Sequence, residues 1–198
     1  MSELSKQMTC YILAGGKSSR MGSDKAFLEL GGRTLLARTL DLAASIGSPV
    51  KIVGEPTKFA HFGSVVQDIY QERGPLGGIQ AALVSTTTEL NLMLAVDQPF
   101  LRPEFLRYLI SRARESSAVV TVPRALGGLQ PLCAVYRKGF LERAERSLGA
   151  GKNKIDALFA GVETRVIDAN ELRNVGFGDE MFHNVNTPED WERAQHEL

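Results

Sequence analysis

The sequence predicts an α/β fold with a mostly parallel central sheet. Short apolar runs alternate along the chain with segments whose apolar residues recur at helical spacing. Strands that are joined through helices require right-handed crossovers, which make neighbouring strands parallel. Ligands of such sheets bind beyond the carboxyl ends of the strands. Gly15, Gly54, Asp68 and Asp97 each follow an apolar run, so we expect them along one edge of the sheet.

Length and composition set the broad class of the protein. A chain of 198 residues predicts one domain over residues 1–198 with a sizeable core. The 23 basic and 23 acidic residues balance, so bulk charge does not indicate a nucleic acid or an anionic membrane as partner. The start, MSELSKQ, lacks the apolar core of a signal peptide, and no apolar stretch approaches the roughly 20 residues that span a bilayer. We therefore expect a cytoplasmic protein, and we take it separately to be a monomer. Cys10 and Cys133 lie in apolar runs and are expected to be buried small hydrophobes.

The pattern predicts the order of the elements. Cys10–Leu13 reads as a buried strand, and a helix is expected from Thr34 to about Ile46, ended by Gly47 and Pro49. The glycines at 127 and 128 predict a mobile loop. The other expected elements are strands at Val50–Val53, Val65–Val66, Asn91–Val96, Ala118–Val122, Leu132–Tyr136 (antiparallel) and Val162–Ile167, and helices at Pro103–Arg114, Lys138–Leu148, Ile155–Phe159 (weak) and from Pro188 to Leu198.

The stretch from Met8 to Lys25 carries the first motif, in which the glycine pair Gly15 and Gly16 breaks an apolar run. Glycines let backbone N–H groups approach a ligand closely, and successive N–H groups can form an anion-binding concavity. The loop that follows holds three cations: Lys17, Arg20 and Lys25. We expect a polyphosphate site here, with an ordinary strand end and solvated charges as the alternative.

Two other phosphate motifs are excluded. The P-loop pattern would place a glycine at position 11, where Tyr11 stands. The dinucleotide pattern fails because Lys17 occupies the place of its second glycine. These mismatches argue against a P-loop kinase and against a nicotinamide enzyme.

The second motif is the run Gly74, Pro75, Leu76, Gly77 and Gly78 ahead of a helical pattern. Pro75 sets a turn, the glycines allow backbone approach, and the helix start would offer free N–H groups to a ligand. A glycine-rich helix entry with no ligand is the alternative.

The third motif is a single carboxylate, Asp97, at the end of an apolar strand. A lone carboxylate suits Mg²⁺, which takes one or two carboxylates and completes its shell with water and substrate phosphates. The three histidines show no zinc-ligand spacing. Asp68 also stands at a strand end. The alternatives are a turn former for Asp97, which precedes Pro99 closely, and an exposed turn acid for Asp68.

The fourth motif lies before the last helix. Thr187, Pro188 and Asp190 are explained by helix capping, which leaves Asn184 and Asn186 unexplained. Alternate residues of an extended segment face the same side, so both amides could reach one ligand. Their alternative is a role as turn formers.

The stretch LAGGKSSRMGSDK resembles the nucleotidyltransferase signature, and in detail the molybdenum cofactor guanylyltransferases (the MobA family). This resemblance implies a single-domain, Rossmann-like, three-layer nucleotidyltransferase fold. It also implies Mg²⁺-dependent transfer of GMP from GTP to the phosphate of molybdopterin, with or without molybdenum, to give a guanine dinucleotide cofactor and pyrophosphate. Transient contact with molybdenum-insertion proteins or acceptor molybdoenzymes would follow.

The same resemblance implies roles for individual residues. Lys25 and Arg20 would act on the developing charge, and Asp97 would bind the metal. Asn184 and Asn186 would lie on the molybdopterin side of the cleft. The implied GTP-binding residues are Leu13, Ala14, Gly15, Gly16, Lys25, Gly54, Asp68, Gly74, Pro75, Leu76, Gly78 and Asp97.

The choice of nucleotide rests on two features. The string GPLGG is what the guanylyltransferases carry, whereas cytidylyl-transferring relatives usually have a serine-bearing string there and a methionine in place of Gln98. The sequence departs from the family at Gly54, where an amide side chain is common, and in a loop between Met21 and Lys25 that is one residue shorter than in some members. The alternatives are a cytidylyltransferase, a sugar-1-phosphate nucleotidyltransferase and a non-enzymatic cofactor carrier.

No Ser/His/Asp or Cys/His nucleophile set is evident, which fits direct nucleotidyl transfer. A phosphate monoester acceptor is already largely ionised near neutral pH, since its second pKa is about 6, so it needs no general base. What remains is positioning and charge stabilisation. We expect the backbone N–H groups of Gly15 and Gly16 to bind the triphosphate.

Overall fold

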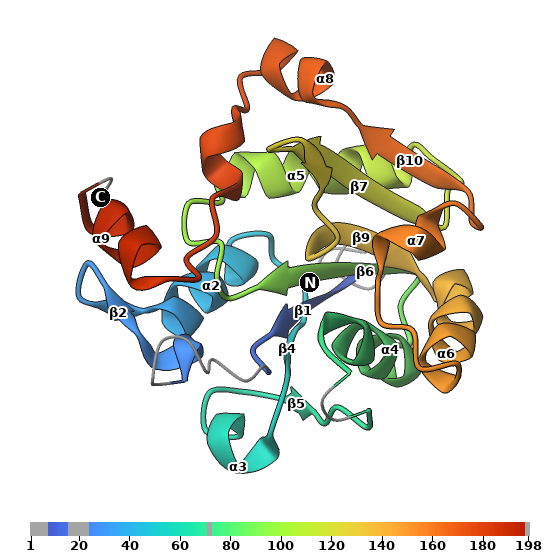
Figure 1. Cartoon of the computed structure of the whole chain (residues 1–198), viewed down its shortest axis with the longest axis horizontal. Coiled ribbons are helices and arrows are strands. Elements are labelled where there is room, and N and C mark those ends of the chain that lie inside the picture. Colours follow the sequence, from blue (N-terminus) through green and yellow to red (C-terminus); the bar gives the residue numbers. More distant parts are fainter. Residues whose placement is uncertain (1–7, 16–23, 71–72, 197–198) are drawn as a thin grey trace.

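The computed structural model describes residues 8–15, 24–70 and 73–196. Its centre is β1 (Met8–Leu13), which pairs in parallel with β4 (Val50–Val53) and β6 (Leu90–Ala95) (Figure 1). The strand order within the described residues is β10-β7-β9-β6-β1-β4-β5. The outer strands are β5 (Val65–Val66), β7 (Val120–Ala125), β9 (Cys133–Arg137) and β10 (Thr164–Ile167). This arrangement confirms the predicted mostly parallel sheet.

The antiparallel strand is β9, as the sequence predicted, because it pairs in antiparallel fashion with both β6 and β7. The expectation of a mobile loop at residues 127 and 128 is wrong. Instead β8 (Gly128–Leu129) pairs with the end of β7 to form a tight hairpin. The two turn residues, Leu126 and Gly127, both have positive φ (51° and 75°), as a two-residue turn of type I′ requires.

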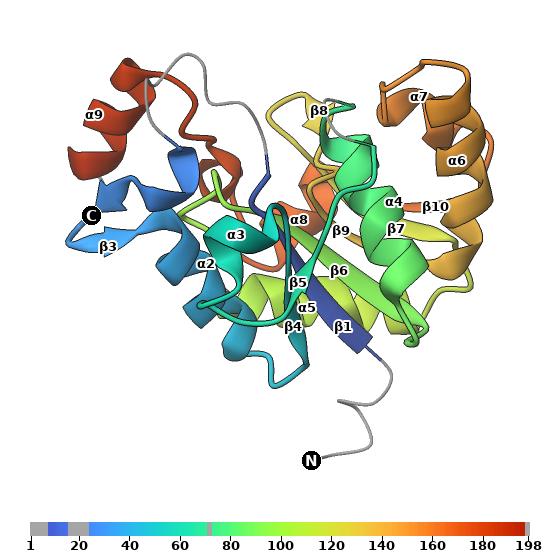
Figure 2. The ribbon, with the colours of Figure 1, turned by 90° about the horizontal axis from the view of Figure 1, so that it is seen from below.

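Helices cover both faces of the sheet and form the outer layers. The helices α2 (Leu35–Ala44) and α5 (Pro103–Arg114) cover one face, and α4 (Pro75–Ser85) and α6 (Leu141–Gly149) cover the other (Figure 2). Along β1, Cys10 and Ile12 pack into the core beneath α2 and α5, whereas Tyr11 and Leu13 pack beneath α4. This alternation is the two-residue period of a strand buried on both faces. The expected three-layer fold is confirmed.

Most element bounds agree with the sequence pattern within about two residues. The segment Lys138–Leu148 divides into a 3₁₀ turn and α6, and α4 begins at Pro75, ahead of the apolar run that predicted it. Two short helices, α3 (Pro56–Phe59) and α8 (Ala169–Asn174), were not predicted, because they contain too few apolar residues to show a helical spacing. The remaining elements are η1 (Lys25–Phe27), β2 (Glu29–Leu30), β3 (Arg33–Thr34), α3 (Pro56–Phe59), η2 (Lys138–Phe140), α7 (Asp156–Phe159), α8 (Ala169–Asn174), η3 (Asp179–Phe182) and α9 (Pro188–His196).

Both cysteines are free and fully buried, as expected. Burial raises the pKa of the Cys10 and Cys133 thiols far above its usual range, so both side chains stay protonated. None of the helices in the described ranges is long and apolar enough to cross a bilayer.

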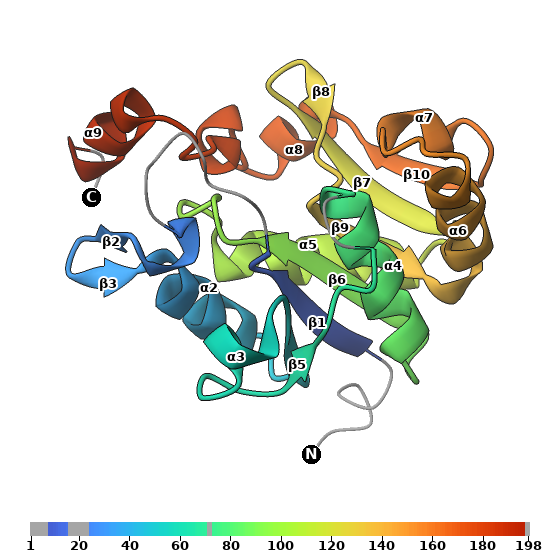
Figure 3. The ribbon, with the colours of Figure 1, turned by 60° about the horizontal axis from the view of Figure 1, so that its bottom comes forward.

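The C-terminal part of the chain returns to the N-terminal half. Figures 1 and 3 both place α9 beside the β2–β3 hairpin. In the segment that leads into α9, the N–H of Val185 donates a 2.9 Å hydrogen bond to the carbonyl oxygen of Asp97. This bond fixes the last segment of the fold against the end of β6.

Candidate active site

The ends of four parallel strands bring the predicted residues to one edge of the sheet. Leu13 lies opposite Val53 on one side and Ala95 on the other, and Val53 lies opposite Val66. The residues just beyond these positions therefore share an edge, and they include Gly15, Gly54, Asp68 and Asp97.

The backbone of Gly15 is used differently from the prediction. The N–H groups of Ala14 and Gly15 both donate to the carbonyl oxygen of Val53, at 3.0 and 3.2 Å, because the chain stays beside β4 after β1 ends. That bond occupies the Gly15 N–H that was expected to bind the triphosphate. Gly15 is exposed and has no side chain, so a ligand can still approach its backbone closely. Gly16, Lys17 and Arg20 lie outside the described residues.

Gly54 owes its identity to a neighbouring ring. A Cβ atom at Gly54 would lie 2.7 Å from Cε2 of Phe59, which is too close for any real contact. Phe59 belongs to α3 and its ring stacks on Phe27 at 5.7 Å between centroids. The space that an amide side chain would need at this position is therefore filled by an aromatic ring.

Two described side chains from distant parts of the sequence, those of Asp97 and Asn186, contact the ammonium group of Lys25. Its Nζ lies 3.2 Å from Oδ2 of Asp97 and donates a 2.6 Å hydrogen bond to Oδ1 of Asn186. The side chains of Lys25 and Asp97 are only 16% and 20% exposed. Because water is largely excluded from this pair, its electrostatic interaction is stronger than that of a surface ion pair.

The lysine is placed by the turn that precedes it. Asp24 caps η1 by accepting a 3.3 Å hydrogen bond from the N–H of Ala26, and its other oxygen forms an ion pair with Lys58 at 3.3 Å. Lys58 also pairs with Glu55 at 3.2 Å. This surface network holds the start of η1 against α3.

The asparagine is placed by the cap of α9. Asp190 accepts hydrogen bonds from the N–H groups of Asn186 and Thr187, both at 3.0 Å, and its own N–H donates to Oγ1 of Thr187 at 3.1 Å. These are the reciprocal bonds of a capping box, which confirms the predicted helix start. The hydrogen bond from Asn186, followed by those from Thr187, lowers the pKa of the Asp190 carboxyl.

Asn184 and Asn186 lie on the same side of their segment, as predicted. Both are exposed, while Val185 between them is 1% exposed and packs into the core. Of these two amides, it is that of Asn186 that accepts a hydrogen bond from Lys25. The two amides are thus presented together at the edge where Asp97 stands.

Asp68 lies against the start of α4. Its Oδ1 accepts a 2.9 Å hydrogen bond from the N–H of Tyr70, and burial raises the pKa of its carboxyl above the usual range. A Cβ atom at Gly77 would lie 3.0 Å from the same oxygen. Gly77 was overlooked among the predicted residues, although the glycine pair in GPLGG is the signal that points to it.

The other residues of this motif divide into two groups. Gly74 precedes α4 with φ +65° and ψ −161°, a conformation open essentially to glycine alone, and Pro75 is exposed at the first helical position. Leu76 is fully buried, and a Cβ atom at Gly78 would lie 3.2 Å from Cδ2 of Leu13. Leu76 and Gly78 therefore set how closely α4 packs on β1.

No three or more His, Cys, Asp or Glu side chains gather to hold a metal within residues 8–15, 24–70 and 73–196. The acidic side chains described at this edge include those of Asp68 and Asp97, which follow separate strands.

Comparison with known proteins identifies close similarity over nearly the whole chain. Residues 10–166 match the family model described as the MobA-like NTP transferase domain. The chain is 37% identical to the probable molybdenum cofactor guanylyltransferase of Pelotomaculum thermopropionicum, covering 96% of this chain and 92% of that protein. It is also 37% identical to the molybdenum cofactor guanylyltransferase of Desulfosudis oleivorans, covering 95% and 94%. Among solved structures, the molybdopterin-guanine dinucleotide biosynthesis protein A of Archaeoglobus fulgidus superposes with a TM-score of 0.83 at 25% identity, covering 95% and 97%.

Proposed function

This chain belongs to the MobA-like NTP transferase family, and on that premise we propose that it transfers GMP from GTP to the phosphate of molybdopterin, releasing pyrophosphate. The relatives named molybdenum cofactor guanylyltransferase support this substrate pair. The observation that carries the proposal is the contact of Lys25 with both Asp97 and Asn186 at the carboxyl ends of the strands. It joins the proposed nucleotide side of the site to the proposed acceptor side.

The reaction requires one bond to form and one to break. A phosphate oxygen of the acceptor attacks the α-phosphorus of GTP, and the bond from that phosphorus to the oxygen that bridges it to the β-phosphate breaks, so that pyrophosphate leaves. The acceptor oxygen is already ionised near neutral pH, and no protein base is required. The protein contributes positioning and stabilisation of negative charge.

Lys25 is the described residue best placed to stabilise that charge. Its side chain is only 16% exposed, and cationic groups act most strongly on developing charge where water is excluded. Asn186 accepts one of its hydrogen bonds and so orients the ammonium group toward the edge of the sheet. Arg20 is proposed as a second cation for the phosphates.

Asp97 suits Mg²⁺, since an isolated carboxylate at the rim of a phosphate site is what this ion commonly uses. Its carboxylate is 20% exposed and is neutralised by Lys25, so the charge can be shared with an incoming cation. When bound, the metal would neutralise charge on the phosphates. The Lys25 ammonium would then be available to the phosphate oxygens.

The nucleoside is proposed to lie between β4 and the start of α4. Around that region Asp68 is half-buried and Gly74 is exposed, while Gly54 is buried at its border. Pro75 begins the helix beside them. Leu13, Ala14, Leu76 and Gly78 are buried, and they contribute by fixing this wall. Gly15 and Gly16 are proposed to lie against the phosphates.

We also propose the properties that accompany this activity. The protein works as a monomeric single domain over residues 1–198 in the cytoplasm, with no nucleic-acid or membrane partner. Its product leaves through transient contact with molybdenum-insertion proteins or acceptor molybdoenzymes.

Paired equilibrium titrations with GTP and CTP in the presence of Mg²⁺ test the nucleotide side of the proposal. A preference for GTP of about tenfold, or roughly 1.4 kcal/mol, is expected. A preference for CTP would contradict guanylyl transfer in favour of cytidylyl transfer. Binding of neither nucleotide would contradict nucleotidyl transfer and leave a cofactor carrier.

A further inference from the structure

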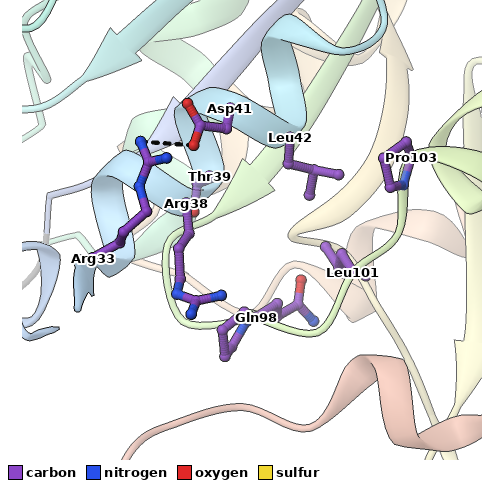
Figure 4. A pocket seen from close by; sticks show the side chains of 9 residues that line it. Arg33, Arg38, Thr39, Asp41, Leu42, Gln98, Leu101 and Pro103 are labelled. Atoms are coloured by element: carbon purple, nitrogen blue, oxygen red, sulfur yellow. Dashed lines mark ion pairs between the residues drawn. The ribbon is translucent and has the colours of Figure 1, made fainter. Parts of the chain in front are cut away.

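A pocket of about 340 Å³ opens between α2 and the loop that follows β6 (Figure 4). Its polar lining includes Arg33, Arg38 and Gln98, and its walls include Leu42 and Leu101. Its volume is at the lower end of the roughly 300–1,000 Å³ typical of small-molecule sites. None of its lining residues belongs to the nucleotide wall described above.

A chain of hydrogen bonds fixes the orientation of the Gln98 amide. The Nε2 group of Gln130 donates to the carbonyl oxygen of Ala125 at 3.0 Å, so the other end of that amide, Oε1, must be an acceptor. The Nε2 group of Gln98 donates a 3.4 Å hydrogen bond to this Oε1 atom of Gln130. The carbonyl oxygen of Gln98 is therefore directed away from Gln130, into the space between Arg38 and Leu101 in Figure 4.

That carbonyl oxygen is buried without a donor. Gln98 is 4% exposed, and no group of the described residues donates to its Oε1. A buried acceptor left without a partner destabilises the fold, so it points to a ligand that supplies an N–H or O–H group.

Cationic donors face the same space. Arg38 donates from Nε to the carbonyl oxygen of Leu30 at 2.8 Å, which anchors its side chain in the wall of the pocket that Gln98 also lines (Figure 4). Arg33 lies at the exposed rim and pairs with Asp41 at 2.8 Å. The pocket is thus lined by both a hydrogen-bond acceptor and an anchored donor.

The rest of the lining is mostly apolar. Leu42 comes from α2, and Leu101 comes from the loop between Pro99 and Pro103. A ligand that fills this space has an apolar body with a hydrogen-bonding edge. A flat heterocycle whose edge carries an N–H next to a C=O meets all of these requirements, because Gln98 accepts from the first and Arg38 donates to the second.

We infer that this pocket binds the pterin ring of the acceptor, an inference that rests on the proposed function. Gln98 directly follows Asp97, and consecutive Cα atoms lie only about 3.8 Å apart. The carbonyl oxygen of Asp97 is in turn bonded to Val185, between Asn184 and Asn186. The pocket and the proposed acceptor amides therefore border the same loop, and a pterin held here lies at one end of the site while its phosphate is directed toward Lys25.

The test is a fluorescence titration of the full chain with 6-hydroxymethylpterin, with and without GTP and Mg²⁺. Arg38→Gln and Gln98→Met are expected to weaken pterin binding at least tenfold, while the GTP affinity of Arg38→Gln changes less than twofold. Arg146→Gln, the same substitution at an exposed residue of α6 outside the pocket, serves as the matched control and should bind pterin like the wild type. Thermal melts confirm that each variant is folded, and the half-buried Arg38 provides the test if Gln98→Met does not fold.

The outcomes separate the two proposals. Wild-type protein that binds no pterin, or variants that bind it unchanged, would overturn the assignment of the pocket. Inorganic phosphate is titrated as a second probe, and phosphate binding that depends on Arg38 alone, without pterin binding, would overturn it in favour of a simple anion site. Failure of GTP to bind, with pterin binding still dependent on Arg38 and Gln98, would contradict only the guanylyl transfer.

Discussion

The Nζ atom of Lys25 lies 2.6 Å from Oδ1 of Asn186, although the two residues are 161 positions apart in the chain. This bond joins the two ends of the chain at the candidate site, because Lys25 follows the first strand and Asn186 precedes the last helix. The capping box of α9 holds one end of the bond, and the turn at η1 holds the other. The geometry of Lys25, which we propose as a catalytic residue, therefore depends on the C-terminal segment.

Replacing Asn186 with Ala should lower kcat about 10²-fold, because a misplaced catalytic group has a cost of this order. Asn184→Ala, which removes the neighbouring exposed amide, should raise the KM for molybdopterin with a smaller effect on kcat. Steady-state kinetics with both substrates varied separates the two. An Asn186→Ala enzyme with the kcat of the wild type would show that the bond to Lys25 has no role in turnover.

Asp97→Asn keeps the shape of the side chain and removes its charge. We expect turnover to fall by about 10² to 10³-fold, since the variant loses an electrostatic group at the reacting phosphates, and added Mg²⁺ should restore little of it. Turnover is measured over a range of Mg²⁺ concentrations, with a thermal melt as the folding control. If turnover is preserved, Asp97 has no part in the mechanism.

Gly77→Ala should reduce GTP affinity about tenfold. The added methyl group would lie 3.0 Å from Oδ1 of Asp68 and from the carbonyl oxygen of Tyr70, so it must displace one of them, at a cost of about 1–3 kcal/mol. Gly149→Ala is the matched control, because nothing lies within 4 Å of a Cβ atom there. A loss of GTP affinity confined to Gly77→Ala therefore reports the contacts with Asp68 and Tyr70 rather than the general preference of helices for alanine. If both variants bind GTP equally well, the packing of Gly77 against Asp68 has no effect on nucleotide binding.

The pH dependence of GTP binding should report Asp68. Burial raises the pKa of its carboxyl, so as pH falls this group takes up a proton before an exposed aspartate, whose pKa is about 3.9, would do so. If the ionised form binds the nucleoside, affinity is full near neutral pH and is lost as pH falls through that raised value. Asp68→Asn should bind more weakly and show no such loss. Titrations at several pH values on folded protein check this, and a wild-type profile that matches the variant would exclude the ionised carboxyl.

The fold and the edge of the site could be predicted because they depend on local patterns. Asp97 and Asp68 end apolar runs, and the parallel register carries such residues to one edge. The use of the Gly15 N–H by Val53 could not be predicted, because it depends on how far the chain stays beside β4 after the strand ends. The contact between Lys25 and Asn186 could not be predicted either, because it joins residues 161 positions apart and no local sequence pattern indicates it. The same holds for the direction of the Gln98 amide, which is set by Gln130 and Ala125 on the neighbouring hairpin.

The most direct measurement of the central claim is a transfer assay with GTP labelled at the α-phosphate, Mg²⁺ and molybdopterin, run beside the same assay with labelled CTP. The account predicts that label from GTP enters a dinucleotide product with equimolar release of pyrophosphate, and that the reaction with CTP is at least about tenfold slower. Label that stays in GTP while the folded protein binds both substrates, or a faster reaction with CTP, would contradict it.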